Sequence, residues 1–113
     1  MADDVIAPPY DVINSKEAFE LAKDRPNSFL HISKPEIDLE NSIAYNDPKV
    51  YQKGKNNLDQ MIENGVLIED SEEMLYLYEM IDNDIHQLGI AAVGSIDAYE
   101  KGQIKRHEFT KPD

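Results

Sequence analysis

The most polar cluster of side chains in the sequence lies at its end. There His107 can move a proton near neutral pH, and Glu108 can act as a base or bind magnesium. Lys105 and Arg106 suit phosphate groups, and Thr110 adds a hydroxyl. Phosphoryl transfer requires positioned charges of this kind. The spacing is also typical of a charged surface strand that leads into a solvated tail, so both interpretations stay open.

A second polar pair, Tyr10 and Asp11, follows two adjacent prolines, Pro8 and Pro9. Because proline fixes φ and pushes the preceding residue toward extended geometry, this segment is predicted to be a rigid loop. On such a loop Asp11 can hold a metal or orient a hydroxyl, and Tyr10 can contact a substrate. The alternative is a turn in which Tyr10 packs on the core and Asp11 caps nearby backbone.

The other histidines and the tyrosine pair give weaker signals. His31 lies in an apolar segment and is expected to be half-buried with its hydrogen bonds satisfied. His86, near an expected turn, is predicted to be exposed. Tyr76 and Tyr78 are expected to pack on a sheet face rather than stack on bases, since no basic residues accompany them. No metal-binding histidine spacing and no cysteine is present, so neither a zinc site nor a disulfide is expected.

Charge is distributed unevenly along the 113 residues, whose formal net charge is −12. Residues 1–100 contain seven Lys and Arg against 21 Asp and Glu, whereas residues 101–113 contain four against two. An acidic body argues against nucleic-acid binding, and only the basic end favours a phosphate or carboxylate. No apolar run approaches the roughly 20 residues of a membrane span. We therefore expect a cytoplasmic protein with neither a nucleic-acid nor a membrane partner; the sequence does not indicate the oligomeric state.

The elements that must position these side chains form an α+β pattern. Helical spacing and capping residues predict helices over residues 14–24, 47–65 and 95–102. Apolar runs between turn residues predict strands over residues 28–32, 66–68, 74–81 and 85–95. The last two are expected to pair as a hairpin, and residues 33–46 are expected to form a polar loop. We expect one domain over residues 1–113, with two or three helices packed on a small, mostly antiparallel sheet.

Several segments occur together in one order. They are Ala7-Pro-Pro-Tyr-Asp-Val12, Asn27-Ser-Phe-Leu-His-Ile32, Pro35-Glu-Ile-Asp38, Val50-Tyr51, Gly65-Val-Leu67, Tyr76-Leu-Tyr78 and Ile104-Lys-Arg-His-Glu-Phe-Thr110. Taken together they resemble the prokaryotic family named domain of unknown function 1015. The resemblance covers nearly the whole chain. It implies a longer protein, of which this chain is the N-terminal portion.

The resemblance also implies a class of activity. An Asp-Gly-His-His-Arg signature further along in the family is similar to one in the ParB and sulfiredoxin-like fold, which includes a nucleotide-dependent free-serine kinase. The family therefore resembles nucleotide-using or phosphoryl-transfer enzymes, and ADP or ATP with magnesium are the implied cofactors. The positions that match family motifs are Pro9, Tyr10, Asp11, His31, His107, Glu108 and Thr110; Arg106 stands where a lysine is common.

Two hypotheses for function stay open. In the first, the chain is part of a phosphoryl-transfer or nucleotide-hydrolysing enzyme and is inactive alone. Its catalytic residues are then Asp11, His107 and Glu108, and its substrate or phosphate contacts are Tyr10, Lys105, Arg106 and Thr110. In the second, the chain is a non-catalytic binding or regulatory module, or a structural subdomain that supports a site elsewhere.

Overall fold

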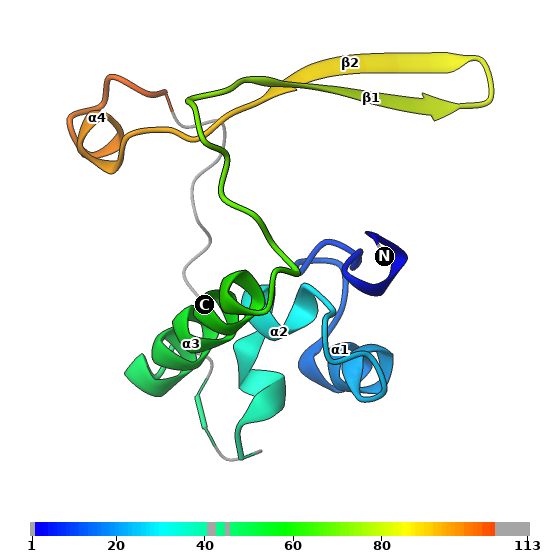
Figure 1. The fold of residues 1–113 in the computed structure, drawn as a ribbon, viewed down its shortest axis with the longest axis vertical. Helices are drawn as coiled ribbons and strands as arrows, with labels where there is room; N and C mark the ends of the chain where they lie inside the picture. The colour runs from blue at the N-terminus through cyan, green and yellow to red at the C-terminus, as the bar shows by residue number, and fades with distance from the viewer. Residues whose placement is uncertain (1, 41–42, 45, 106–113) are drawn as a thin grey trace. The chain divides into compact units, whose positions relative to one another are not determined.

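The computed structural model describes residues 2–40, 43–44 and 46–105, which fall into two compact units. The first unit, Met1–Glu69, is helical, and the second, Asp70–Asp113, contains a β-hairpin and a short helix (Figure 1). Four α-helices and one two-stranded antiparallel sheet in this described part confirm the predicted α+β class. The single-domain organisation stays a prediction.

Helix α1, Ser15–Ala22, begins with the capping box that the sequence predicts. Asn14 Oδ1 accepts a hydrogen bond from the Glu17 N–H at 3.0 Å, and Glu17 Oε2 accepts one from the Asn14 N–H at 2.9 Å. Two backbone donors that the helix leaves unpaired are thereby satisfied. Ala18 and Ala22, one turn apart, are almost completely buried. Their small side chains make α1 one wall of the core.

The strand predicted over residues 28–32 is wrong, because this segment forms a turn followed by helix α2, Leu30–Ser33. Leu30 is only 1% exposed and packs with Ala18 and Ala22. A short apolar run has no periodicity that distinguishes a strand from a buried helical turn. Here the backbone N–H groups of His31 and Ile32 bond to the carbonyls of Ser28 and Phe29, which closes helical turns instead.

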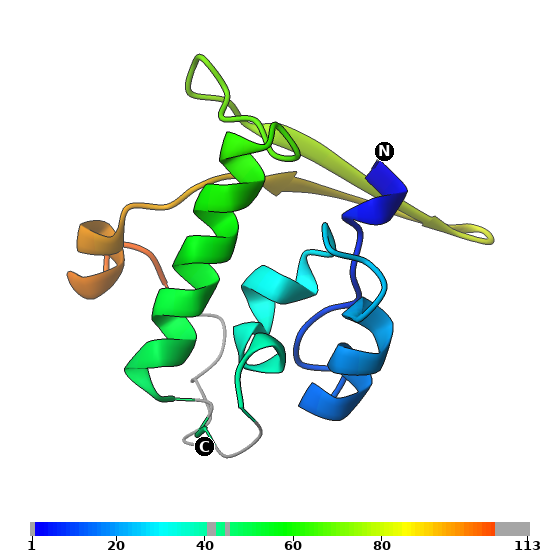
Figure 2. The ribbon, with the colours of Figure 1, turned by 60° about the horizontal axis from the view of Figure 1, so that its bottom comes forward.

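The predicted loop over residues 33–46 contains a short 3₁₀ helix, η2, Pro35–Asp38. Helix α3, Pro48–Glu63, follows, and its cap Asp47 accepts a hydrogen bond from the Lys49 N–H at 2.8 Å. Within the first unit, α2 and η2 lie between α1 and α3 (Figure 2). Gly54 on α3 makes this approach possible, since a Cβ there would lie 3.2 Å from Pro35 Cγ and 3.3 Å from the Ile32 carbonyl oxygen.

The end of α3 shows why the strand predicted over residues 66–68 is wrong. Gly65 has a φ of +69°, as expected for a helix-ending glycine. The N–H of Val66 then bonds to the Met61 carbonyl at 2.9 Å, and the N–H of Leu67 bonds to the same oxygen at 3.1 Å. These donors complete the helix terminus and are not available to a sheet.

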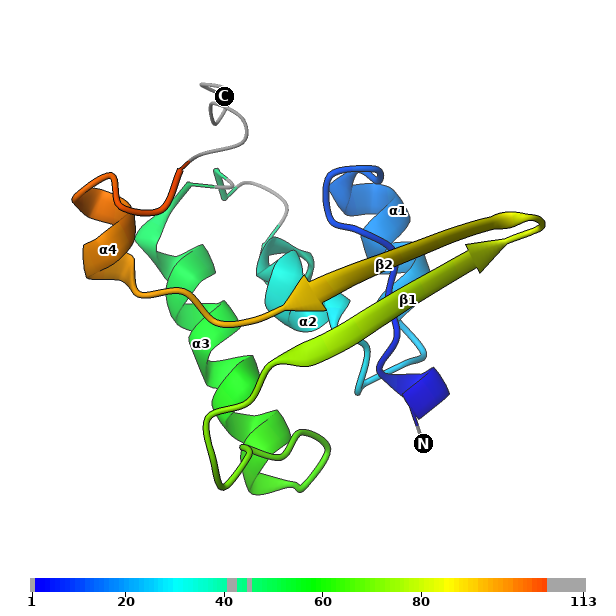
Figure 3. The ribbon, with the colours of Figure 1, turned by 90° about the horizontal axis from the view of Figure 1, so that it is seen from above.

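The second unit is built on the predicted hairpin (Figure 3). Strand β1, Tyr76–Asp82, pairs with β2, Ile85–Ala91, in an unbroken register from Tyr76↔Ala91 to Asp82↔Ile85. The connection has two residues, and Asn83 adopts a φ of +51°, the left-handed conformation that tight hairpin turns require. Helix α4, Ile96–Glu100, begins with the predicted cap Ser95 and ends before Gly102, whose φ is +70°.

Candidate functional site

The Tyr10–Asp11 pair lies on a turn of the first unit that is closed by the Val12 N–H and the Pro9 carbonyl at 3.3 Å. Tyr10 is 62% exposed, so the alternative in which it packs on the core is wrong. Asp11 is exposed and forms no side-chain hydrogen bond or ion pair with another described residue. Lys34 contacts this turn, because its Nζ donates to the Tyr10 carbonyl at 3.4 Å. The turn thus presents a carboxylate and a phenol to solvent.

The other predicted site residues belong to the second unit. Lys105 is exposed there, after helix α4. Arg106, His107, Glu108 and Thr110 lie outside the described residues. The structure therefore does not test whether the basic cluster and the Tyr10–Asp11 turn form one site, and that grouping stays a prediction.

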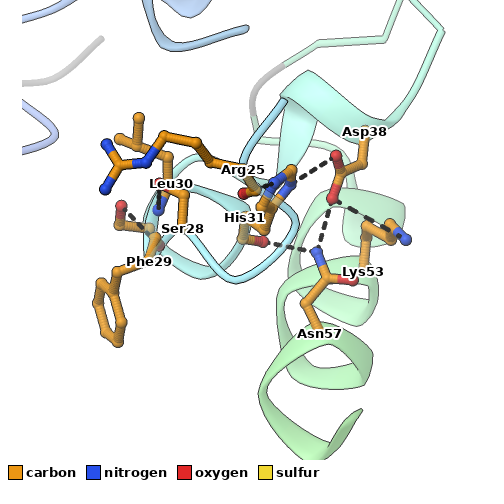
Figure 4. A network of polar contacts seen from close by, with 9 residues as sticks. Arg25, Ser28, Phe29, Leu30, His31, Asp38, Lys53 and Asn57 are labelled. Atoms are coloured by element: carbon orange, nitrogen blue, oxygen red, sulfur yellow. Dashed lines mark hydrogen bonds and ion pairs between the residues drawn. The ribbon is translucent and has the colours of Figure 1, made fainter. Parts of the chain in front are cut away.

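A polar network that the sequence does not predict connects α2, η2 and α3 (Figure 4). His31 Nδ1 lies 2.8 Å from Asp38 Oδ1, and His31 Nε2 lies 3.2 Å from the Arg25 carbonyl oxygen. Asn57 Nδ2 donates to the His31 carbonyl at 2.6 Å and to Asp38 Oδ2 at 2.8 Å. His31 is thus half-buried and satisfied as expected, although on a helix rather than on a strand.

The network holds one carboxylate with three polar partners. Asp38 Oδ1 faces His31, whereas Asp38 Oδ2 accepts from Asn57 and lies 4.0 Å from Lys53 Nζ. The Lys53 pairing is loose, because 4.0 Å is beyond hydrogen-bond distance and its side chain is 34% exposed. Both nitrogens of His31 face acceptors, so its ring is oriented from two sides. These contacts fix His31, Asp38 and Asn57 in one arrangement.

An open cavity of about 380 Å³ adjoins the network. Four carboxamide side chains line it, those of Asn27, Asn57, Gln60 and Asn64. His31, Asp38 and Lys53 supply the charged and ionisable part of the wall, and Pro26 and Met61 supply the apolar part. The volume lies at the lower end of the range of about 300–1,000 Å³ that is usual for small-molecule sites. Its lining is more polar than most such sites, and this favours a ligand that forms hydrogen bonds.

The signal that could have revealed the network is Asn57. Its neighbours on one face of α3 are Val50, Gly54 and Met61, which are buried at helical spacing. An asparagine at a position that should be apolar requires a hydrogen-bond partner once it is buried, and Asn57 is only 7% exposed. Sequence spacing could not identify the partners, since Asp38 lies 19 residues away and His31 lies 26 residues away.

Shifted pKa values occur away from this cavity. Hydrogen bonding and charge attraction by Lys23 lower the pKa of Glu20, and Glu20 raises the pKa of Lys23 in return. In the second unit, the hydrogen bond from the Tyr76 hydroxyl to Asp70 raises the pKa of Tyr76. All three groups are exposed, so they report surface contacts rather than a catalytic environment.

The described residues include no group of three or more His, Asp or Glu side chains placed to hold a metal ion. In the same part of the chain, no helix has both the length and the apolar character needed to cross a membrane. A metal shared with a phosphate ligand needs only one or two carboxylates, so the exposed Asp11 is compatible with that chemistry.

Comparison with known proteins relates this chain to one protein family. No curated protein and no solved structure matches the chain. The family described as "Protein of unknown function (DUF1015)" matches over residues 1–113, the whole of the sequence. The match agrees with the resemblance that the motifs indicate, and the chain belongs to the DUF1015 family.

Proposed function

We propose that this chain supplies the N-terminal part of a cytoplasmic, nucleotide-dependent phosphoryl-transfer or nucleotide-hydrolysing enzyme. The observation that carries the proposal is the exposed Asp11 carboxylate, which a closed turn presents to solvent beside Tyr10. A carboxylate of this kind can share a magnesium ion with the phosphates of a bound nucleotide. The proposed relation to the ParB and sulfiredoxin-like fold rests on family motifs, not on the described residues.

In this proposal the two polar segments have complementary roles. Asp11 binds magnesium, and Tyr10 contacts the substrate. Lys105, Arg106 and Thr110 bind phosphate, and His107 and Glu108 take part in proton transfer or metal binding. Catalysis of this type consists mainly of positioning and charge stabilisation, so it needs no covalent intermediate on the protein.

Calorimetric titration of the protein that contains this chain with ADP or ATP plus magnesium tests the proposal. We expect binding that needs magnesium, and we expect Asp11→Asn to weaken it at least about tenfold, or ~1.4 kcal/mol. Asp24→Asn is the matched control, because Asp24 is also an exposed carboxylate of the first unit. The absence of any heat change at millimolar nucleotide would overturn the proposal.

A second candidate is a binding or regulatory module without catalysis. The cavity beside Asn57 favours this binding module. Its ionisable residues His31 and Asp38 already contact each other and backbone or amide groups, so they are positioned for binding rather than for proton transfer. Alanine at His107 and at Glu108 separates the two candidates. Loss of turnover with nucleotide binding retained supports the enzyme, and unchanged function in both variants supports the module.

A further inference from the structure

We propose that the cavity lined by α2, η2 and α3 binds a small uncharged molecule that carries several hydroxyl groups. The site belongs entirely to the first unit, and all of its lining residues are described. It is separate from the Tyr10–Asp11 turn, so failure of magnesium–nucleotide binding would leave this inference standing.

The charges around the cavity favour an uncharged ligand. One carboxylate, Asp38, and one ammonium group, Lys53, line it with their side-chain charges 4.0 Å apart. An anion placed against Lys53 would also lie close to Asp38, and a cation placed against Asp38 would lie close to Lys53. Because Asp38 also accepts from Asn57 and contacts His31, the carboxylate has little capacity left for a cationic ligand.

The carboxamides provide the capacity for hydrogen bonds. Each has one acceptor oxygen and an NH₂ group with two donors. The side chains of Asn27, Gln60 and Asn64 form no hydrogen bond with another described residue. Asn57 directs its Nδ2 into the network, and its Oδ1 has no described donor. Since no buried side-chain polar atom of the described part lacks a partner, this oxygen keeps some contact with solvent although Asn57 is only 7% exposed.

Hydroxyl groups match this lining because each one can donate and accept, as a carboxamide can. Met61 and Pro26 add an apolar portion to the wall, which suits the C–H surface of a sugar ring. The sugar of a nucleoside and a free monosaccharide share this chemistry.

The arrangement is partly formed in advance of binding. Gln60 lies three residues after Asn57 on α3, and the C-cap Asn64 lies four residues after Gln60, so the three carboxamides follow one face of the helix. Met61, four residues after Asn57, lies beside them. The two hydrogen bonds of Asn57, at 2.6 and 2.8 Å, hold its oxygen in a fixed direction. A ligand that meets fixed groups loses less freedom on binding, so a weak polar site can still be selective.

Titration of the isotope-labelled chain with D-ribose and with adenosine, followed by NMR, tests the inference. We expect the side-chain NH₂ signals of Asn27, Asn57, Gln60 and Asn64 to shift with both compounds. The double variant Gln60→Ala with Asn64→Ala removes two exposed carboxamides that form no side-chain hydrogen bond with another described residue, and we expect about tenfold weaker binding.

The matched control is Gln52→Ala with Asn56→Ala, which removes two carboxamides of α3 that bond to each other outside the cavity. This control should bind both compounds as the original chain does. Equal loss in both double variants, or no shift with either compound, would overturn the inference. Binding of adenosine without ribose would refute the hydroxyl assignment, and tighter binding of inorganic phosphate would refute the preference for an uncharged ligand.

Discussion

The two units of this protein hold their structure in different ways. In Met1–Glu69, side chains that are distant in sequence meet, as Ala18, Ala22 and Leu30 do in the core. In Asp70–Asp113, both strands of the hairpin are exposed along their whole length. Leu77, Leu88 and Ile90 are each at least 70% exposed. The hairpin is held by its backbone register and its turn, whereas the helical unit is held by burial.

This difference indicates where a site can be formed by fixed side chains. An isolated two-stranded hairpin is marginally stable in water, and a third strand or a packed helix normally supports it. Helices that pack on a core and share satisfied polar contacts, by contrast, hold side chains in single positions. The His31–Asp38–Asn57 network therefore lies in the unit that is able to keep it in place.

The largest expected difference between the two units is in the effect of truncating one leucine in each. Leu30→Ala removes a nearly fully buried side chain, and we expect the free energy of unfolding to fall by roughly 2–5 kcal/mol. Leu88→Ala changes a side chain that is 70% exposed, and we expect a change within about 0.5 kcal/mol. Urea denaturation followed by circular dichroism measures both. Equal losses in the two variants would show that the hairpin leucine is buried in solution.

Removing the central amide tests whether the network stabilises the helical unit. Asn57→Ala leaves Asp38 Oδ2 and the His31 carbonyl without their shared donor, and we expect a loss of roughly 1–3 kcal/mol. Asn56→Ala, one residue earlier and exposed, is the control. If Asn57→Ala and Asn56→Ala are equally stable in the same denaturation experiment, the network does not stabilise the helical unit.

The helix caps of the two units offer a finer comparison. Asn14→Ala breaks a capping box of two hydrogen bonds, and we expect a loss of roughly 0.5–2 kcal/mol. Ser95→Ala removes a single 3.3 Å bond from the five-residue helix α4, so its effect should be smaller and local. Amide hydrogen exchange measures each helix separately. A larger effect at Ser95 than at Asn14 would contradict this ranking.

The smallest expected effect on stability comes from the Tyr76–Asp70 contact in the second unit, which depends on pH. Its hydrogen bond to Asp70 raises the pKa of Tyr76 above the ordinary value of 10.0. This contact therefore contributes stability that is fully present below pH 10.0 and is lost as the pH rises through the raised pKa. Phenolate absorbance should show one tyrosine that ionises at a higher pH than an ordinary tyrosine, and Asp70→Asn should remove this difference. Asp84→Asn should leave the titration unchanged, and an unchanged curve for Asp70→Asn would disprove the contact.

Local signals in the sequence were sufficient for most elements. Asn14 with Glu17, Asp47 with Pro48, and Ser95 each begin the helix that they predict. The hairpin and its turn are also as predicted, because the aliphatic and aromatic runs on either side of Asp82-Asn-Asp84 are signals that act over few residues. Such signals depend only on neighbours in the chain, which makes them readable without knowledge of the fold.

The two strand predictions that are wrong concern short apolar segments whose conformation is determined by contacts elsewhere in the fold. Residues 28–32 turn into a helix because Leu30 finds a buried position against α1, and residues 66–68 complete the α3 terminus. The candidate network was missed because its contacts join Asp38, His31 and Asn57 across long stretches of chain. Tertiary contacts of this kind override short apolar patterns, and no local spacing encodes them.

The close approach at Gly54 links the width of the cavity to a residue that carries no functional group. Gly54 precedes Asn57 by three residues on α3, and it contacts the turn that ends at Asp38. A methyl group at position 54 would lie 3.2 Å from Pro35 Cγ and 3.3 Å from the Ile32 carbonyl oxygen, so these neighbours would have to move by a few tenths of an ångström. A residue without a functional group of its own therefore lets α3 approach the Pro35–Asp38 turn closely enough for the Asn57 amide to reach Asp38.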